Sequence, residues 1–253
     1  MNKLYNKSEL GFAIFWIIAY IVLVGIADGI SAVIGIEKII TVIVLITMTV
    51  IVFCWIFRNK HMERYGLCLP KHKARNYLYY LPLILMVSIN LWLGVSLNFS
   101  ILESVLYIIS MLSVGFLEEI IFRGFLFKAM AKENLLSAII VSSVTFGIGH
   151  LVNLFTGGGM GLLSNICQVF YAMSAGFLFV VIFYRGGSLI PCIIAHGLFN
   201  AISCFMNYSA LTATVDIIIS LVIIVINVVY TLILLKLLPS DKNTQPTEDK
   251  NKN

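Results

Sequence analysis

Charged side chains are scarce in this sequence. Only 11% of its 253 residues are Asp, Glu, Lys or Arg, whereas an ordinary soluble domain carries about 25%. Hydrophobic residues make up 60% of the chain, and the mean hydropathy is +1.00. This shortage of charge excludes a soluble globular domain and indicates a protein that lies in a lipid bilayer.

Cysteine is also sparse, with five residues and no CxxC pair. An odd number of thiols without paired spacing excludes both a disulfide framework and a structural zinc knuckle. The net charge of +5 does not call for a nucleic-acid partner, because membrane proteins carry such an excess of Lys and Arg on their cytoplasmic side.

Apolar segments of about 20 residues, the length needed to cross a bilayer, recur along the chain. The expected spans are 11–34, 39–57, 77–97, 101–117, 136–155, 163–184, 189–208 and 212–238. Backbone groups in lipid must be hydrogen-bonded within their own segment, which requires helices at these lengths. We therefore expect an all-α, polytopic membrane protein with one bundle of about eight transmembrane helices over 1–238. The polar tail at 239–253 is expected to be disordered and cytoplasmic.

The basic residues predict the orientation of the bundle. With eight spans, every Lys and Arg except Lys38 falls on one side of the membrane. Because cytoplasmic loops carry the excess of Lys and Arg, this partition predicts a multi-pass protein of the cell membrane with both termini in the cytoplasm.

The stretch GFLEEIIFRGFLF, residues 115–127, places three charges in an apolar run. A charge at the bilayer centre costs about 2.5–3.5 kcal/mol, so such residues are candidates for function. Glu119 and Arg123 are four residues apart and can pair on one helix face. Glu118 points about 100° away, which makes it the candidate base. The same pattern also occurs at ordinary helix ends at the membrane interface.

Two histidines also lie in apolar segments. Asn200 follows His196 by four residues and shares its helix face. If the helix that carries Glu119 turns near Asn134, Glu119 lies 15 residues before the turn and His150 lies 16 residues after it. An antiparallel hairpin would therefore place both at one depth. His196 lies nine residues after Gly187, near which its helix is expected to begin. This distance is roughly 13 Å, so the three helices can bring these groups together.

Three motifs occur in a fixed order. The segments EEIIFR, FGIGH and HGLFN, at 118–123, 146–150 and 196–200, match EExxxR, FxxxH and HxxxN. In these motifs the chain resembles the CAAX-protease and bacteriocin-processing (CPBP, also called Abi) family of intramembrane proteases, over about residues 100–208. The resemblance implies an intramembrane endopeptidase, a hydrolase acting on a peptide or membrane-anchored substrate of the CAAX type or related to bacteriocins. The partners it implies are this substrate and the lipid bilayer.

The resemblance also implies a set of catalytic residues and a role for each. The set is Glu118, Glu119, Arg123, His150, His196 and Asn200. The first glutamate would activate water with the help of the first histidine, and the second glutamate would pair with the arginine. The second histidine and the asparagine would stabilise the oxyanion. No Ser or Cys is paired with a base in these motifs, so water is expected to attack directly.

The metal requirement is open at this stage. Members of the family are commonly labelled metalloproteases, and Glu118, His150 and His196 could supply three ligands to a zinc ion with an open fourth position. The sequence lacks the HExxH motif of zinc proteases, which favours a metal-free reading. The same residues can serve as base and oxyanion donors without a metal.

Two other functions fit parts of the sequence. A non-catalytic bacteriocin-immunity or peptide-binding membrane protein would not need Glu118, and a proton-coupled transporter could use the carboxylates and histidines as a relay. Against the transporter, no inverted repeat is present. Asp28 lies between Gly25 and Gly29 in GIADG, where close helix packing with a hydrogen-bonded Asp is expected.

Overall fold

The computed structural model describes residues 1–70, 80–154 and 161–238. These residues form helices and connecting loops without any β-strand, apart from an isolated bridge between Val95 and Met206. The all-α fold is therefore confirmed. The tail expected to be disordered, 239–253, lies outside the described residues.

The helices follow the apolar segments of the sequence. In chain order they are α1 (Asn2–Lys7), α2 (Glu9–Ile34), α3 (Ile39–Arg58), α4 (Leu81–Ser88), α5 (Ile101–Glu119), α6 (Lys128–Met130), α7 (Leu135–Gly149), α8 (Leu162–Gly186), α9 (Ile190–Ile202) and α10 (Ala213–Leu237). A π-helix, η3 (Ile120–Phe127), joins α5 to α6. Short 3-10 turns are η2 (Ile89–Leu91), η4 (His150–Leu154), η5 (Ser203–Phe205) and η6 (Tyr208–Ala210).

Six of these helices are long and apolar enough to cross a membrane: α2, α3, the continuous run from α5 to α6, α7 with η4, α8 and α10. The two other expected spans appear as shorter apolar helices, Leu81–Leu91 and Ile190–Phe205. The chain is a polytopic membrane protein, and each expected segment contains a helix. The expected count of eight full crossings is not confirmed.

Capping residues determine where the site-bearing helices begin. Ser100 and Glu103 form a capping box at the start of α5, and Asn134 caps α7 through its side chain and the Ser137 amide at 2.8 Å. Such caps satisfy the free amides of the first turn. Gly187 ends α8 in the left-handed region, with φ 71°, which favours glycine. These ends set how far α5, α7 and α9 reach into the bundle.

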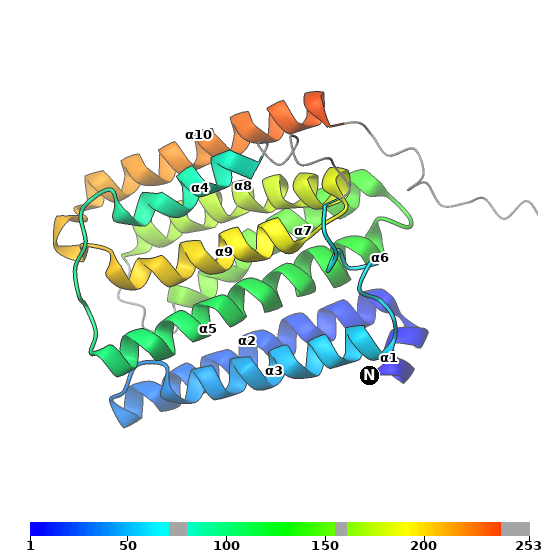
Figure 1. Cartoon of the computed structure of the whole chain (residues 1–253), viewed down its shortest axis with the longest axis horizontal. Coiled ribbons are helices and arrows are strands. Elements are labelled where there is room, and N and C mark those ends of the chain that lie inside the picture. The colour runs from blue at the N-terminus through cyan, green and yellow to red at the C-terminus, as the bar shows by residue number, and fades with distance from the viewer. Residues whose placement is uncertain (71–79, 155–160, 239–253) are drawn as a thin grey trace, which may run out of the picture.

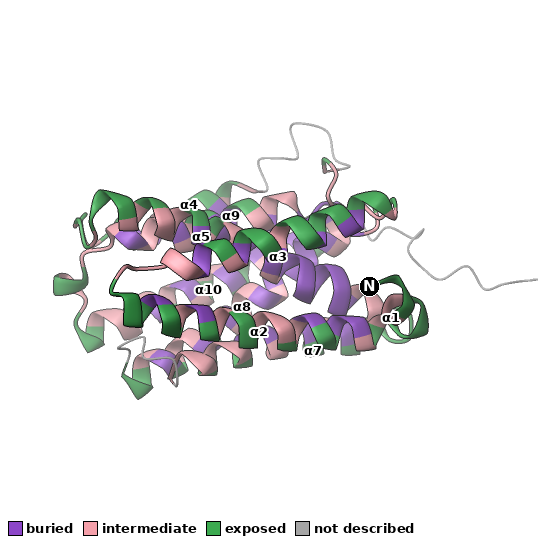
Figure 2. Cartoon of the chain, turned by 90° about the horizontal axis from the view of Figure 1, so that it is seen from below, coloured by how far each residue is buried: buried purple, intermediate pink, exposed green. Residues whose placement is uncertain are grey.

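The long helices run along one common axis, with α1 and the last turn of α10 at the same end (Figure 1). α5 packs between α3 and α9, while α8 packs against α7 and α10. Figure 2 shows buried and exposed residues alternating along α2 and α3. Many exposed residues are large and apolar, such as Ile18, Ile43 and Leu232, which suits a surface that faces lipid.

Basic segments far apart in the sequence meet at the α1 end of the bundle. Glu9, at the start of α2, pairs with Arg64 at 2.6 Å and with Lys132 at 2.8 Å. Arg185, at the end of α8, donates to the Leu238 carbonyl at 3.2 Å. Lys38 lies between the end of α2 and the start of α3, at the opposite end of α2. For these described residues the predicted partition matches the two ends of the bundle, and the cytoplasmic orientation stays a prediction.

Candidate active site

The motif glutamates stand where α5 changes into a π-helix. α5 ends at Glu119, and all eight residues of η3 are buried. Isolated π-turns within longer helices are frequent at functional sites, because the wider turn redirects side chains. The helix continues to Met130 and the chain turns before Leu135, so the hairpin expected near Asn134 is present.

Glu119 is the centre of a buried charge network. Its Oε1 accepts a hydrogen bond from Arg123 Nη1 at 3.1 Å and another from His196 Nδ1 at 2.8 Å. The side chains of Glu119 and Arg123 are both 0% exposed, and buried charges of this kind are tolerated only when they are paired. The pair expected from the i, i+4 spacing is therefore present, and it also holds a histidine from α9.

An aromatic ring supports this network from α7. The Arg123 guanidinium carbon lies 4.0 Å from the centroid of the Phe146 ring, a cation–π contact. The same ring makes edge contacts with His150 at 5.1 Å and with His196 at 5.6 Å. The phenylalanine of the second motif thus packs against the other motif residues.

Glu118 faces away from Arg123, but it is not unpartnered. Its Oε1 accepts a 2.6 Å hydrogen bond from the Tyr20 hydroxyl, and its Oε2 lies 3.7 Å from His196 Nε2. The side chain is 14% exposed. Sequence reasoning missed Tyr20, which lies on α2. The signal that could have found it is its position well inside an apolar span, since tyrosines of membrane proteins usually lie near span ends.

His150 ends α7 and begins η4. Its Nδ1 lies 3.0 Å from the Phe146 carbonyl, and because a carbonyl can only accept, Nδ1 is the donor. This bond leaves Nε2 as the nitrogen with a free lone pair in the neutral ring. The backbone carbonyl of His150 accepts a hydrogen bond from Asn165 Nδ2 at 3.1 Å. This bond connects the end of α7 to α8.

A cavity of about 730 Å³ lies beside these residues. Glu118, His150 and Asn200 line it, together with Tyr20 and Phe146. In the described part of the chain the Asn200 side chain makes no hydrogen bond, so its amide is available to a ligand. Glu119, Arg123 and His196 do not line this cavity. His196 lines a smaller cavity of about 60 Å³ together with His150 and Asn200. Glu118, His150 and Asn200 thus face the larger cavity, and His196 connects them to the buried pair of Glu119 and Arg123.

The residues proposed as zinc ligands do not form a metal-binding group. Within 1–70, 80–154 and 161–238, no three His, Cys, Asp or Glu side chains are placed to hold an ion together. The hydrogen bonds of Glu118 Oε1 to Tyr20 and of His196 Nδ1 to Glu119 orient these two side chains. The described residues therefore give no support for a zinc ion shared by Glu118, His150 and His196.

The two glycines beside Asp28 do not make a close helix contact. A Cβ added to Gly25 or Gly29 would meet nothing within 4 Å of the described residues, so this part of the expectation is wrong. The neighbouring Ala27 and Ser31 are nevertheless buried where α2 packs on α3. Asp28 itself is hydrogen-bonded, as expected, to Thr41 and Lys38. The tight crossing lies elsewhere: a Cβ on Gly115 of α5 would stand 2.5 Å from the backbone nitrogen of Gly197 on α9.

The fold and this site describe a multi-pass membrane protein with a buried charge network beside a polar cavity. Residues 100–202, about two fifths of the chain, match the family model Rce1-like, described as type II CAAX prenyl endopeptidase Rce1-like. The match confirms the resemblance to the CPBP family over this segment and supports an intramembrane CAAX-type protease in general. No curated protein and no solved structure matches the chain.

Proposed function

We propose that this protein is an intramembrane endopeptidase in which Glu118 activates a water molecule. The observation that carries the proposal is the position of the Glu118 carboxylate. It borders the cavity, is oriented by Tyr20 and shares the cavity wall with His150 and Asn200. A partly buried carboxylate with one oxygen fixed by a donor can hold a water in one orientation.

In the proposed reaction, Glu118 removes a proton from water while the water oxygen adds to the substrate carbonyl carbon. His150 lines the same cavity and accepts or returns a proton through Nε2. Glu118 then passes the proton to the amide nitrogen, the C–N bond breaks, and a carboxylate and an amine leave. The atoms balance without a covalent enzyme intermediate, which suits motifs with no paired Ser or Cys nucleophile.

Charge that develops on the carbonyl oxygen needs hydrogen-bond donors in the cavity. Asn200 Nδ2 is available for this purpose, since its amide has no other partner among the described residues and faces the cavity. His196 stands between the two glutamates, with Nδ1 on Glu119 and Nε2 near Glu118. We assign it to hold Glu118 in place and to assist Asn200, as the family resemblance implies.

Glu119 and Arg123 support this arrangement from behind the cavity. The Arg123 guanidinium compensates the negative charge of Glu119. Glu118 therefore does not lie beside a second, uncompensated carboxylate. The Glu119–His196 bond then fixes the imidazole from α9 against α5. We therefore propose a positioning role for Glu119 and Arg123, without contact with the substrate.

The substrate we propose is a membrane-anchored peptide of the CAAX type, which the description of the matched family suggests. The test uses the full-length protein in detergent and a fluorogenic prenylated CAAX peptide. Glu118→Gln keeps the size of the side chain and removes its basicity, and we expect a loss in kcat of about 10²–10⁴-fold. Glu133→Gln, an exposed glutamate at the end of the hairpin, is the matched control.

The outcomes separate the parts of the proposal. Equal turnover by wild type and Glu118→Gln rejects Glu118 as the base. If mass spectrometry finds no cleavage by the wild type over a panel of prenylated peptides, the CAAX-type substrate is rejected. Loss of activity in the Glu133→Gln control would show that the assay reports general damage to the protein.

A further inference from the structure

The cavity beside Glu118 extends along α2 toward the end of the bundle that lies opposite α1. The same space of about 730 Å³ borders Glu118 and His150 in one part and Asp28 and Lys38 in another. Tyr20, which bonds to Glu118, and Asp28 are eight residues apart on α2, a rise of roughly 12 Å. A ligand whose reacting bond lies at Glu118 can therefore extend to a second set of polar groups.

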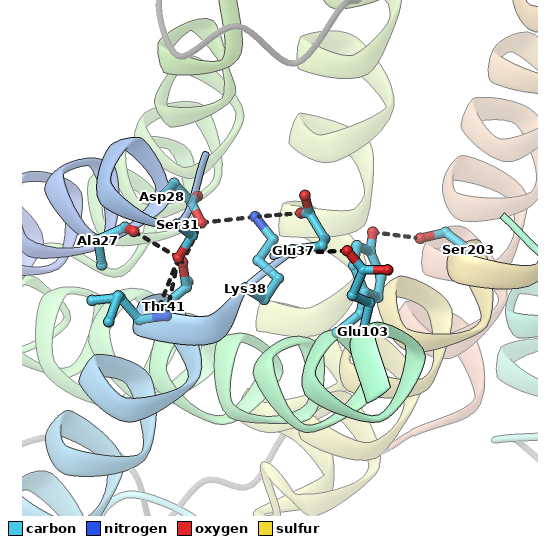
Figure 3. Close-up of polar contacts among 10 residues, drawn as sticks. Ala27, Asp28, Ser31, Glu37, Lys38, Thr41, Glu103 and Ser203 are labelled. Atoms are coloured by element: carbon cyan, nitrogen blue, oxygen red, sulfur yellow. Dashed lines mark hydrogen bonds and ion pairs between the residues drawn. The ribbon is translucent and has the colours of Figure 1, made fainter. Parts of the chain in front are cut away.

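These polar groups, Asp28, Lys38 and Thr41, are called the distal cluster here, and Figure 3 shows them between α2 and α3. Asp28 Oδ1 accepts hydrogen bonds from Lys38 Nζ at 2.8 Å and from Thr41 Oγ1 at 2.5 Å. Lys38 Nζ also lies 3.6 Å from Glu37. The Lys38 charge is thus shared between two carboxylates.

Asp28 keeps one acceptor open. Both of its hydrogen bonds end on Oδ1, and in the described residues no donor reaches Oδ2. The Asp28 side chain is 30% exposed and lines the cavity. The cluster therefore presents a carboxylate oxygen to whatever lies in the cavity, held in place by two donors on the other oxygen.

The charges along the cavity favour a cation at this place. Among the described lining residues, three carboxylates face one ammonium: Asp28, Glu118 and Asp216 against Lys38. Lys38 is already paired with Asp28 and Glu37. A negatively charged ligand group that approached Lys38 would therefore contact these two carboxylates, and like charges in contact are strongly unfavourable. A positively charged group on Asp28 Oδ2 would instead offset the excess of carboxylates.

We propose that the distal cluster is a specificity subsite that binds a basic side chain of the substrate. The inference rests on the proposed function for the position of the cleaved bond beside Glu118. An extended peptide advances about 3.3–3.6 Å per residue, so roughly 12 Å corresponds to three or four residues between the cleaved bond and the basic residue. The substrate class is a peptide with Lys or Arg at that separation.

The test measures binding separately from cleavage. A short fluorescein-labelled peptide of Ala and Leu with one central Lys is compared with counterparts that carry norleucine or Glu at that position. Fluorescence anisotropy with the full-length Glu118→Gln protein in detergent gives Kd without consuming the probe. We expect the Lys peptide to bind about tenfold more tightly than the norleucine peptide, the range of a hydrogen bond to a charged group.

Two variants in the same background assign the effect. Asp28→Asn should abolish the preference for Lys, whereas Lys38→Gln should keep or increase it, because Asp28 loses its internal cation. Glu103→Gln is the matched control, since Glu103 lies in the same region (Figure 3) but does not line the cavity. If Asp28→Asn fails to fold, the Lys38→Gln variant still tests the proposal. A preference for Lys that is kept or increased supports it, and a lost preference contradicts it.

Equal binding of the three peptides overturns the proposal, as does tighter binding of the Glu peptide that is lost in Lys38→Gln. The latter result would indicate that Lys38 binds a carboxylate of the peptide. A failure of the proposed function looks different, because it abolishes cleavage by the wild type while the preference for Lys in binding persists. Mass spectrometry of cleaved Lys peptides then tests the separation of three or four residues.

Discussion

The Tyr20 hydroxyl donates a 2.6 Å hydrogen bond to Oε1 of Glu118, and these two residues are 98 positions apart. Tyr20 belongs to α2, outside the segment 100–202 that matches the family model. The first transmembrane helix therefore contributes directly to the candidate site. By occupying one carboxylate oxygen, the hydroxyl leaves Oε2 toward His196, at 3.7 Å from its Nε2.

Replacing this hydroxyl should slow catalysis without weakening substrate binding. We expect Tyr20→Phe to lower kcat by about tenfold, because loss of a hydrogen bond to a charged group costs about 1.5–3 kcal/mol. KM should stay within a factor of about two, because the variant keeps the aromatic ring that lines the cavity. Tyr230→Phe, at a buried tyrosine of α10, is the control. A rise in KM with unchanged kcat would contradict the positioning role.

Arg123 should be essential for stability as well as activity. Its partner Glu119 is completely buried, and removing one member of a buried pair leaves an uncompensated charge at a cost of about 3–5 kcal/mol. Arg123→Met should therefore lower the thermal unfolding temperature in detergent and abolish turnover, because Glu119 also holds His196 at 2.8 Å.

The double variant Glu119→Gln with Arg123→Met checks this explanation. It removes both charges together, so we expect it to recover much of the lost stability and little of the activity. The coupling is obtained from the four unfolding temperatures of a double-mutant cycle. Additive effects of the two substitutions would contradict a direct buried ion pair.

Gly115 should tolerate no side chain. A Cβ there would stand 2.5 Å from the nitrogen and 2.6 Å from the Cα of Gly197, so the alanine methyl must push α5 away from α9. These helices carry the glutamates and His196, respectively, and we expect Gly115→Ala to lower both the unfolding temperature and kcat. Gly25→Ala is the control, because nothing lies within 4 Å of its added Cβ. Equal effects of the two variants would contradict the tight crossing.

Local helix periodicity explains which features could be predicted from the sequence. Glu119 and Arg123 pair because residues four apart share a helix face. The turn expected near Asn134 is also present, and in the structure Asn134 is the N-cap of α7. Matching depths along three helices predicted that these groups meet, but the particular hydrogen bonds between helices could not be predicted. The Glu119–His196 bond joins residues 77 positions apart, and the Tyr20 bond depends on how α2 packs against η3.

The two short helices show a second limit. Hydropathy extends the expected spans 77–97 and 189–208 beyond the helices, because the residues after α4 and α9 are also apolar. In the structure these residues pair with each other instead. Ser96 donates its backbone N–H to the Phe205 carbonyl at 2.9 Å, and Asn98 bonds to the carbonyls of Cys204 and Met206. A hydropathy window cannot distinguish this paired loop from a helix.

Chelation should leave the activity intact if Glu118 activates water without a metal ion. The described residues bring no three potential ligands together. We therefore expect the wild-type kcat to be unchanged after prolonged dialysis against 1,10-phenanthroline, with metal content followed by mass spectrometry. A known zinc protease in the same detergent is the positive control. Loss of activity that zinc restores would contradict the metal-free mechanism, and a Tyr20→Phe protein that binds zinc more tightly would show that the tyrosine competes with a metal for the same carboxylate.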